Sequence, residues 1–513
     1  MLIAALAGAG SVLAFAPFGY WPLQMVALTI LFHQVLHAAS VKSGFLVGWA
    51  FGFGWCAAGV HWLFIAMHRF GGMPAPAAAL GVVLLALFLG SYCALAMGGA
   101  AWLQRRWLLP LPVMALVLLP ALWAWGEWLR GVVFTGFPWV AAGYAHNAGP
   151  LAGYAPLLGV YGLGWLAALC GGALLLLGQN SPRTRLLAIG TVAGVGVAGF
   201  ALQQIDWTHP IGRPITVRLL QGNIAQDEKF IPGHIEGALA AYQAAITAEP
   251  ADLIATPETA IALFPQQLAP DYLPNLQRFA RDSGSHLLLG IPLAESPVRY
   301  SNSALGIAPG SDLFYRYDKH HLVPFGEFIP TGFRWFVDLM AIPLGDFRRG
   351  AVVQAPFQVR DQRVLPNICY EDLFGEEIAG QLAAAHSAGQ QSATILLNMS
   401  NLAWYGESIA IAQHLQISQM RSLETGRPML RSTNSGATAI IDSHGRVASR
   451  LPPYTAGTLS ASVQGMGGLT PYIWYGNLLF LAICSLALPG AWMLARKCRK
   501  YSQSEDKRKV NEG

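Results

Sequence analysis

The stretch at residues 364–372, "VLPNICYED", decides how the second half of this chain folds. It starts as an apolar run and ends on Cys369, which two carboxylates, Glu371 and Asp372, follow closely. A short apolar run bounded by polar residues is typical of a buried β-strand. Polar residues at the ends of such strands usually carry the chemistry of α/β proteins. Cys369 is therefore a candidate functional residue at a strand end.

Similar short apolar runs recur on both sides of this stretch, separated by Gly, Pro, Asn and Asp, which punctuate loops. The predicted strands lie at 215–224, 252–258, 286–293, 302–308, 313–323, 364–371, 393–400, 428–442 and 447–451. Helical patterns lie between several of them, at 234–248, 270–283, 374–388 and 407–425. This alternation predicts an α/β sandwich with buried sheets.

The first 205 residues differ in composition from this region. Of 513 residues in the whole chain, 54% are hydrophobic and 12% charged, against roughly 25% charged in an average soluble domain. A membrane-spanning helix needs about 20 apolar residues. Eight segments meet that pattern, at 2–17, 22–40, 44–67, 77–101, 110–129, 156–178, 185–204 and 472–495. We therefore predict a multi-pass α-helical membrane domain.

Basic residues predict its orientation, because Lys and Arg accumulate in cytoplasmic loops. With a cytoplasmic N-terminus, twelve Lys and Arg residues fall inside, and only Arg69 and Arg130 fall in short outer loops. This predicts four parts: a seven-span domain (1–205), a catalytic domain on the outer face (206–470), an eighth transmembrane helix (471–495) and a basic cytoplasmic tail (496–513). The net charge of +5 lies largely in that tail, so it does not indicate nucleic-acid binding.

Glycine-rich runs and one carboxylate, Glu127, stand out in the predicted spans. Glycine-rich runs such as "GVYGLGWLAALCGG" (159–172) indicate close helix packing, since no Walker lysine follows them. Glu127 lies near a span end, where an ionisable group usually has a partner or a function. It either pairs with Arg130, three residues on, or has a task of its own.

Three polar residues at predicted strand ends fit one chemistry: Glu258, Lys319 and Cys369. A cysteine nucleophile needs a base, because a free thiol has a pKa near 8.5. Glu258 can be that base. Lys319 and the N–H that follows Cys369 can stabilise an oxyanion. Taken singly, each has a simpler interpretation: a first-turn carboxylate, a surface lysine and a buried core cysteine.

Neighbouring histidines could suggest a metal site. His320 and His321 are adjacent, but neither an HExxH motif nor paired cysteines accompany them. We therefore expect no metal and no cofactor.

Longer motifs carry a resemblance. The order Glu, Lys, Cys in one αββα sandwich resembles the nitrilase (carbon–nitrogen hydrolase) superfamily. More narrowly, the chain resembles the apolipoprotein N-acyltransferase family, its membrane-embedded branch. The motifs are "FAPFGYWP" (15–22), "FGGMPAP" (70–76), "GEWLRG" (126–131), "TGFPW" (135–139), "QGNI" (221–224), "DKHHLVPFGEFIP" (318–330), "ICYED" (368–372), "NMSNLAWYG" (398–406), "HLQISQMRSLETGRPMLRSTNSG" (414–436) and "GLTPY" (468–472).

The resemblance implies roles for further residues. Glu327 and Glu371 would orient Lys319 and the nucleophile loop, with Tyr370 as a further support. Residues that would bind substrate or line its pocket are Phe230, Asn302, Trp404 and Arg349. Phe230 stands where the family commonly has Trp, and Leu402 where it often has Asp, so this chain departs from the family in its substrate loops.

The resemblance also implies a reaction and a location. Cys369 would take an acyl chain from a phospholipid as a thioester and pass it to the free α-amine of a lipoprotein's N-terminal diacylglyceryl-cysteine. The enzyme would be a monomer in the bacterial inner membrane, with its catalytic domain on the periplasmic face. Two alternatives stay open: a membrane-tethered amidase or hydrolase with the same triad, and a transporter or receptor whose outer domain only binds. Rare charges in the spans argue against the transporter.

Overall fold

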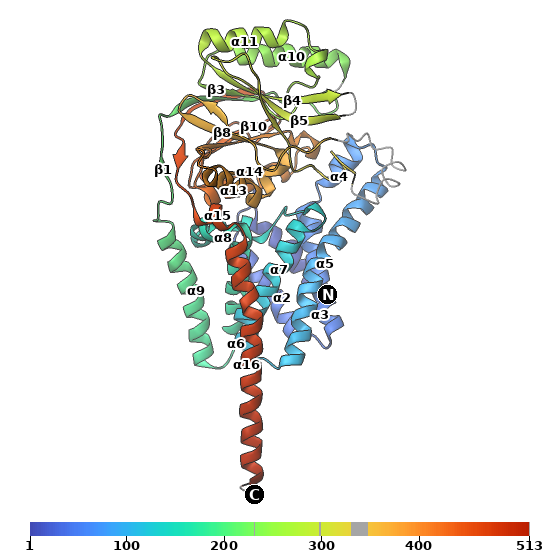
Figure 1. Ribbon diagram of the computed structural model, residues 1–513. Helices are drawn as coiled ribbons and strands as arrows, with labels where there is room; N and C mark the ends of the chain where they lie inside the picture. Colours follow the sequence, from blue (N-terminus) through green and yellow to red (C-terminus); the bar gives the residue numbers. More distant parts are fainter. Residues whose placement is uncertain (230, 297–298, 330–346, 512–513) are drawn as a thin grey trace. The chain divides into compact units, whose positions relative to one another are not determined.

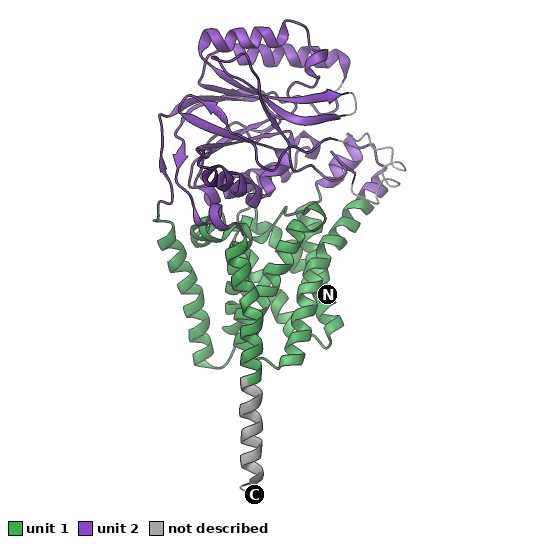
Figure 2. Ribbon diagram, in the orientation of Figure 1, with its two compact units in different colours: residues 1–61, 79–205, 477–513 green, residues 62–78, 206–476 purple. Residues whose placement is uncertain are grey.

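The computed structural model describes residues 1–229, 231–296, 299–329 and 347–511, which form two compact units (Figure 2). Unit 1 contains residues 1–61, 79–205 and 477–513, and unit 2 contains residues 62–78 and 206–476. Residues 62–78, which the sequence analysis assigned to the membrane half, therefore fold with unit 2.

Unit 2 is built on two six-stranded sheets (Figure 1). One sheet has the order β13-β2-β3-β4-β5-β6. Its strands are β2 (Ile215–Gln221), β3 (Leu253–Ala255), β4 (His286–Ser296), β5 (Arg299–Ile307), β6 (Tyr315–Asp318) and β13 (Gly457–Val463). The other has the order β12-β11-β10-β9-β8-β7. Its strands are β7 (Phe357–Val359), β8 (Gln362–Ile368), β9 (Ile395–Ser400), β10 (Met429–Thr433), β11 (Ala439–Ile441) and β12 (Val447–Arg450).

Both sheets have three parallel strands at their centre and antiparallel strands at their edges. The parallel strands are β2, β3 and β4 in one sheet and β8, β9 and β10 in the other. Parallel strands direct their carboxyl ends to the same edge of the sheet, and this edge is where α/β folds place their sites.

Alternate side chains of the central strands enter different cores. Leu288 packs between the two sheets, whereas its neighbours Leu287 and Leu289 pack under the helices α10 (Pro232–Thr247) and α11 (Tyr272–Ser283). On the outer face of the other sheet, α13 (Gly375–Ser387) and α14 (Ala410–Thr425) contribute side chains to the core that includes it. Figure 1 shows these helices outside the two sheets. The predicted αββα sandwich is confirmed.

Four of the described strands were not predicted from the sequence. They are β7, β13 and the short pair β1 (His209–Pro210) and β14 (Met466–Gly467). The strand β13 lies at a sheet edge, where every residue but Val463 is at least partly exposed. Edge strands lack the continuous apolar run that marks a buried strand, so the hydropathy pattern missed them.

Unit 1 is helical. Its helices are α1 (Leu2–Gly10), α2 (Pro22–Leu36), α3 (Val41–Gly59), α5 (Ala75–Trp107, whose first turn belongs to unit 2), α6 (Leu111–Val113), α7 (Leu119–Val132), α8 (Ala155–Leu176), α9 (Pro182–Leu202) and α16 (Leu478–Asn511). Among the described residues, five helices are long and apolar enough to cross a membrane: Ala75–Trp107, Leu111–Thr135, Pro150–Leu176, Pro182–Leu202 and Leu478–Arg496. The chain thus has the helices of a membrane protein, but eight spans are not confirmed.

Three predicted spans account for the difference. Two of them are shorter apolar helices, Leu2–Ala14 and Pro22–Leu36. The third is a bent pair, Val41–Gly59 and Leu63–Phe70, which would raise the number of described spans to six if it crosses as one. The last predicted span also starts later than expected, because Gly476, at φ 51°, separates α15 (Pro471–Tyr475) from α16.

Glycines allow the helices of unit 1 to pack closely, as the sequence predicts. A Cβ on Gly8 would lie 2.1 Å from the carbonyl oxygen of Phe51, and one on Gly54 equally close to that of Ala5. Glycine is therefore required where α1 meets α3, because any side chain would strike backbone.

Glu127 pairs with Arg130, with 3.5 Å between Oε1 and the guanidinium, and both side chains are buried. Arg130 also donates to the carbonyls of Phe137 and Trp139, and Oε1 of Glu127 accepts from the N–H of Ala142. This buried pair holds the connection that follows α7 against its own helix, which supports the structural alternative for Glu127.

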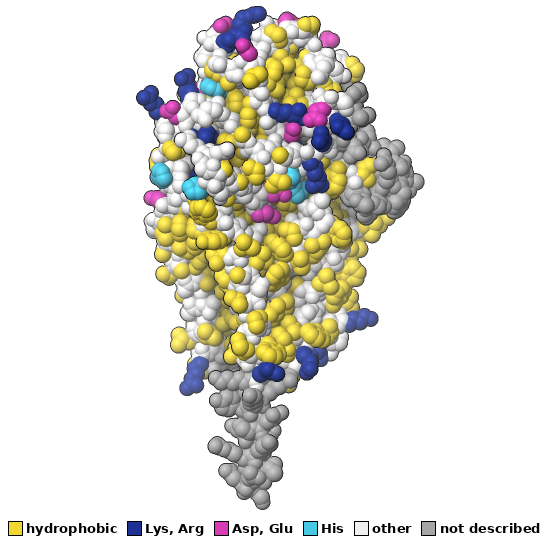
Figure 3. All heavy atoms as spheres, in the orientation of Figure 1, with side chains coloured by type: hydrophobic (Ala, Val, Ile, Leu, Met, Phe, Trp, Pro, Cys, Tyr) yellow, Lys and Arg dark blue, Asp and Glu magenta, His cyan; other side chains and the backbone are white. Residues whose placement is uncertain are grey.

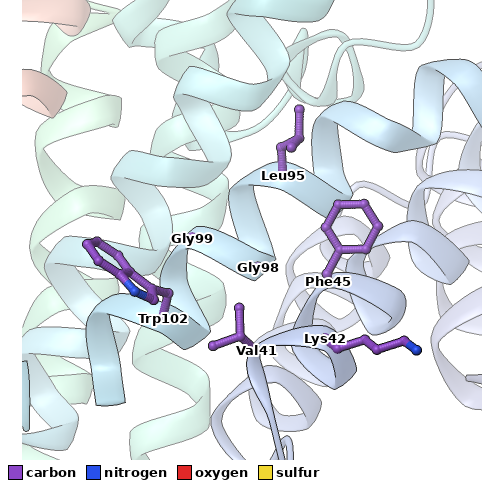
Figure 4. Close-up of a pocket in the computed structure, with 7 residues that line it drawn as sticks. All are labelled: Val41, Lys42, Phe45, Leu95, Gly98, Gly99 and Trp102. Carbon is purple, nitrogen blue, oxygen red and sulfur yellow. The ribbon is translucent and has the colours of Figure 1, made fainter. Parts of the chain in front are cut away.

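The surface of unit 1 is strongly apolar. On the face drawn in Figure 3, hydrophobic side chains cover most of this unit, and Lys and Arg side chains gather at one end. Arg105 near the end of α5 donates to the carbonyl of Ala38, just before α3 begins. A groove of about 480 Å³ lies between α3 and α5 and is lined by Val41, Lys42, Phe45, Leu95, Gly98, Gly99 and Trp102 (Figure 4).

Candidate active site

The structure brings Glu258, Lys319 and Cys369 together in unit 2. Glu258 follows β3, Lys319 directly follows β6, and Cys369 directly follows β8. Nζ of Lys319 lies 3.3 Å from Oε1 of Glu258, and the charges of both residues act on the thiol of Cys369. Residues 50 to 111 positions apart thus share one site, because both sheets present strand ends to it.

Cys369 occupies a sharp turn between β8 and a short 3-10 helix, Cys369–Leu373. Its φ is 55°, a left-handed conformation that costs a non-glycine residue energy and often marks functional positions. Two side chains hold its carbonyl oxygen: Nδ2 of Asn398 and Nε2 of His414, each at 3.3 Å. In this turn, Cys369 is only partly buried.

His414 has a defined role in this turn. Its Nδ1 accepts from the guanidinium of Arg431 at 2.8 Å, so its Nε2 carries the proton that Cys369 O accepts. Burial, with the charge of Arg431, holds the pKa of His414 well below its usual value. His414 is therefore a neutral donor that positions the backbone of Cys369.

Glu258 lies in a tight turn against β4. Gly290 of that strand makes the turn possible, since a Cβ there would lie 2.0 Å from the carbonyl oxygen of Pro257. The hydroxyl of Thr256 accepts from the N–H of Gly290 at 2.9 Å, and the N–H of Ile261 donates to Gly290 O. These contacts fix the backbone on both sides of Glu258.

Two carboxylates share the ammonium of Lys319. Oε1 of Glu327 lies 2.8 Å from Nζ, and Oε1 of Glu258 lies 3.3 Å from it. Lys319 is fully buried, and the two glutamates are exposed by less than a tenth of their surface. The other oxygens are also bonded, Oε2 of Glu258 to the N–H of Asn401 and Oε2 of Glu327 to that of Val323.

Asn302 lies between these carboxylates. Its Nδ2 donates to Oε1 of Glu258 at 2.8 Å and to Oε1 of Glu327 at 2.9 Å. Its backbone carbonyl accepts from the N–H of Lys319. These contacts fix the spacing of the two carboxylates, and its expected contact with substrate stays a prediction.

Burial and the two carboxylates set the protonation of the site. Burial works against the charge of Lys319, but the charges of Glu327 and Glu258 outweigh it and hold its pKa well above the usual value. For Cys369, burial and the negative charge of Glu258 raise the pKa of the thiol, and Lys319 only partly opposes them. The resting site therefore holds a thiol beside a carboxylate and a cationic lysine.

Glu371 connects the turn that contains Cys369 to the loop that follows Lys319. Its Oε2 accepts from the N–H of Ile368 at 2.6 Å and from the hydroxyl of Tyr317 at 3.0 Å. Its Oε1 accepts from the N–H of His320 at 2.7 Å. Burial raises its pKa, which these N–H donors partly offset. Glu371 thus ties together the backbones that precede Cys369 and follow Lys319.

Tyr370 packs beside this connection. It is buried, and its ring lies against His321 and Phe374 at centroid distances of 5.8 and 5.3 Å. His321 stacks on Phe374 and contacts Oε1 of Glu377 at 2.8 Å. These histidine contacts are with protein groups, and the described residues contain no cluster of His, Cys, Asp or Glu that could hold a metal.

The other residues expected to bind substrate are less enclosed. Trp404 is 40% exposed, on the 3-10 helix Leu402–Tyr405 that follows Asn401. Arg349 is exposed, with its guanidinium 4.9 Å from the ring centre of Phe328. Phe230 lies outside the described residues. Leu402, the departure from the family's Asp, is fully buried in the core between the sheets.

One contribution to the site was missed by the sequence analysis. The segment Trp62–Phe70 packs on the loop that carries Trp404. The indole N–H of Trp62 donates to Oε1 of Gln413 at 3.1 Å, its ring lies 4.3 Å from that of Tyr405, and Phe70 meets Trp404 edge-on at 5.8 Å. Its only sequence signal was the helix-breaking "FGGMPAP" motif (70–76) that follows.

Comparisons with known proteins agree with this division of the chain. The model of the apolipoprotein N-acyltransferase N-terminal domain matches residues 7–173, and that of the carbon–nitrogen hydrolases matches residues 216–472. An apolipoprotein N-acyltransferase of Ralstonia nicotianae is 50% identical, over 97% of this chain and 93% of its own length. Those of Bordetella bronchiseptica and Nitrosomonas europaea are 42% and 43% identical, over 97% and 95% of this chain and 97% and 96% of their own.

Proposed function

The chain belongs to the apolipoprotein N-acyltransferase family of enzymes, and on this premise we propose its reaction. It transfers a fatty acyl chain from a phospholipid, through a thioester on Cys369, to the free α-amine of the N-terminal diacylglyceryl-cysteine of apolipoproteins. The observation that carries this proposal is the meeting of Cys369, Glu258 and Lys319 at strand ends, with the lysine 3.3 Å from the glutamate. The product is a triacylated lipoprotein.

In the first half-reaction, Glu258 takes the proton of the Cys369 thiol as Sγ attacks the ester carbonyl of the phospholipid. The oxyanion that forms is stabilised by Nζ of Lys319 and the N–H of Tyr370. The carbon–oxygen bond then breaks, and the leaving glycerol oxygen takes the proton from Glu258. Lysophospholipid departs, and the acyl chain stays on Sγ as a thioester.

In the second half-reaction, the amine of the diacylglyceryl-cysteine attacks the thioester carbonyl. Glu258 takes a proton from the amine, and the same donors stabilise the second oxyanion. The carbon–sulfur bond breaks and Sγ recovers the proton. A ping-pong order suits two lipid substrates, because the thioester holds the acyl group while one lipid leaves and the other binds.

Supporting roles follow from the contacts of the site. Glu327 holds Lys319, Asn302 spaces the two carboxylates, and Glu371 ties the Cys369 turn to the lysine loop. Phe230, Trp404 and Arg349 are the candidates for contact with lipid.

The membrane arrangement is part of the same proposal. We infer eight spans, seven before the catalytic domain and one after it, with the N-terminus in the cytoplasm and the catalytic domain on the periplasmic face of a bacterial inner membrane. The Lys and Arg side chains that gather at one end of unit 1 support this orientation. A membrane-impermeant maleimide tests it: Asp312→Cys should be labelled from the periplasm and native Cys498 should not.

Purified protein mixed with a defined phospholipid and a diacylglyceryl-cysteine peptide tests the reaction. We expect N-acyl peptide, lysophospholipid and an acyl mass increase at Cys369 before the peptide is added. Free fatty acid or ammonia alone would instead indicate a hydrolase with the same triad, the alternative that the carbon–nitrogen hydrolase match favours. Full acyl transfer by Cys369→Ser and Glu258→Gln would contradict both mechanisms.

A further inference from the structure

A second lysine lies at the site and has no part in the mechanism above. Lys229 lies in the loop between β2 and α10, and it is 6% exposed. Its Nζ donates to the backbone carbonyl of Glu258 at 3.3 Å, a fully buried contact. Burying an ammonium costs free energy unless nearby charges of opposite sign balance it. Lys229 beside Glu258 is therefore expected to have a function.

The loop that carries Lys229 is bonded to the turn that holds Glu258. Nδ2 of Asn401 donates to Oε1 of Gln226 at 2.7 Å, and the N–H of the same Asn401 donates to Oε2 of Glu258 at 2.9 Å. Asn434 bonds both the N–H and the carbonyl of Ile224, and also Oδ1 of Asn401. Lys229 is therefore placed by a continuous network, whereas a surface lysine would have none.

The ammonium of Lys229 changes the net charge of the groups around Cys369. Glu258, Glu327 and Lys319 together carry one net negative charge beside the thiol, and each carboxylate raises the pKa of Cys369. A second ammonium brings that sum to zero. Burial lowers the pKa of Lys229 to about 8, and the charges of Glu258 and Cys369 oppose the decrease, so most of it stays charged at pH 7. Asp227 and Glu228 on its own loop are exposed to solvent.

We propose that Lys229 is a positioning residue of the acyl transfer: its ammonium seats the loop on Glu258 and offsets the excess negative charge around Cys369. The thiolate and each oxyanion then form at a lower cost. This role rests on the proposed function of Glu258, Lys319 and Cys369. It also explains why the loop that leads to Phe230 is attached to the general base itself.

The test measures the alkylation of Cys369 by iodoacetamide between pH 6 and 9, in the full-length protein without lipid substrates. Lys229→Met should slow alkylation at pH 7 by about tenfold, the effect of one pKa unit on the thiolate fraction. Lys229→Arg keeps the charge and should stay within about threefold of the unmodified protein. Lys229→Gln, which keeps a donor but loses the charge, should behave like Lys229→Met and replaces it if that variant does not fold.

Glu228→Gln is the matched control, because it changes one exposed charge on the same loop. An unchanged alkylation profile in Lys229→Met and Lys229→Gln would overturn the proposal, as would an equal loss in Lys229→Arg. The proposed function has a separate readout, the acyl mass at Cys369 in the presence of phospholipid. Its failure would leave the alkylation result unaffected, so the two can be told apart.

Discussion

The ammonium of Lys319 lies 2.8 Å from Oε1 of Glu327, closer than to Oε1 of Glu258 at 3.3 Å. In the proposed mechanism, Glu258 loses its charge when it takes the proton of the thiol, but Lys319 keeps the nearer counter-ion. The lysine can then face a developing oxyanion without leaving its position. Glu327 thus holds the oxyanion donor, while Glu258 is free to change its protonation state.

Glu327→Gln should lower kcat by about 100-fold, because the displaced ammonium no longer meets the oxyanion, and should leave KM within about threefold. The measurement is steady-state acyl transfer from a defined phospholipid. Glu377→Gln is the control, since Glu377 pairs with His321 and not with Lys319. Equal losses in both variants would count against a specific role for Glu327.

Lys319→Met should destabilise the protein as well as inactivate it. It leaves two buried carboxylates with no cation between them, a loss of about 3–5 kcal/mol. Thermal unfolding in detergent measures this, and Lys319→Met/Glu327→Gln should recover part of the loss.

The reactivity of Cys369 should depend on pH in a way set by its raised pKa. Because burial and Glu258 disfavour the thiolate, alkylation at pH 7 should be slower than that of a free thiol and should increase about tenfold per pH unit up to pH 9. Glu258→Gln removes one of these causes. It should speed alkylation but abolish the acyl-enzyme. A plateau below pH 8 in the unmodified protein would contradict the assignment.

Trp62 should be needed by the catalytic unit although it lies within the predicted membrane span 44–67. Trp62→Ala should destabilise unit 2 by about 3–5 kcal/mol, since it empties the space against Tyr405. Trp62→Phe keeps an aromatic ring against Tyr405 but loses the hydrogen bond to Gln413, and should cost less, about 1 kcal/mol. Trp102→Ala, at an exposed site on α5, is the control. Unfolding that is unchanged in Trp62→Ala would refute this role.

Much of the catalytic unit could be predicted from local patterns. A buried strand must be apolar over its length and must end where polar residues begin, so β8 and the position of Cys369 could be read directly. The same holds for the helices on the two outer faces. Edge strands such as β13 could not, because partial exposure lets polar and apolar residues mix there.

The membrane unit was harder to predict. Hydropathy averaged over a window identifies apolar segments, but it does not show where a helix bends or ends. It therefore predicted one span over 44–67, where the structure ends α3 at Gly59 and folds the next residues with unit 2.

Sequence alone was sufficient to propose the chemistry of this protein, because a cysteine, a carboxylate and a lysine each follow a recognisable strand in motifs of one family. It could not show that Asn302 separates two carboxylates, that Lys229 lies against Glu258, or that Trp62 supports the Trp404 loop. Those contacts join residues 25 to 351 positions apart. They exist only because sheet packing brings distant strand ends and loops together, and no periodicity along the chain records which of them meet.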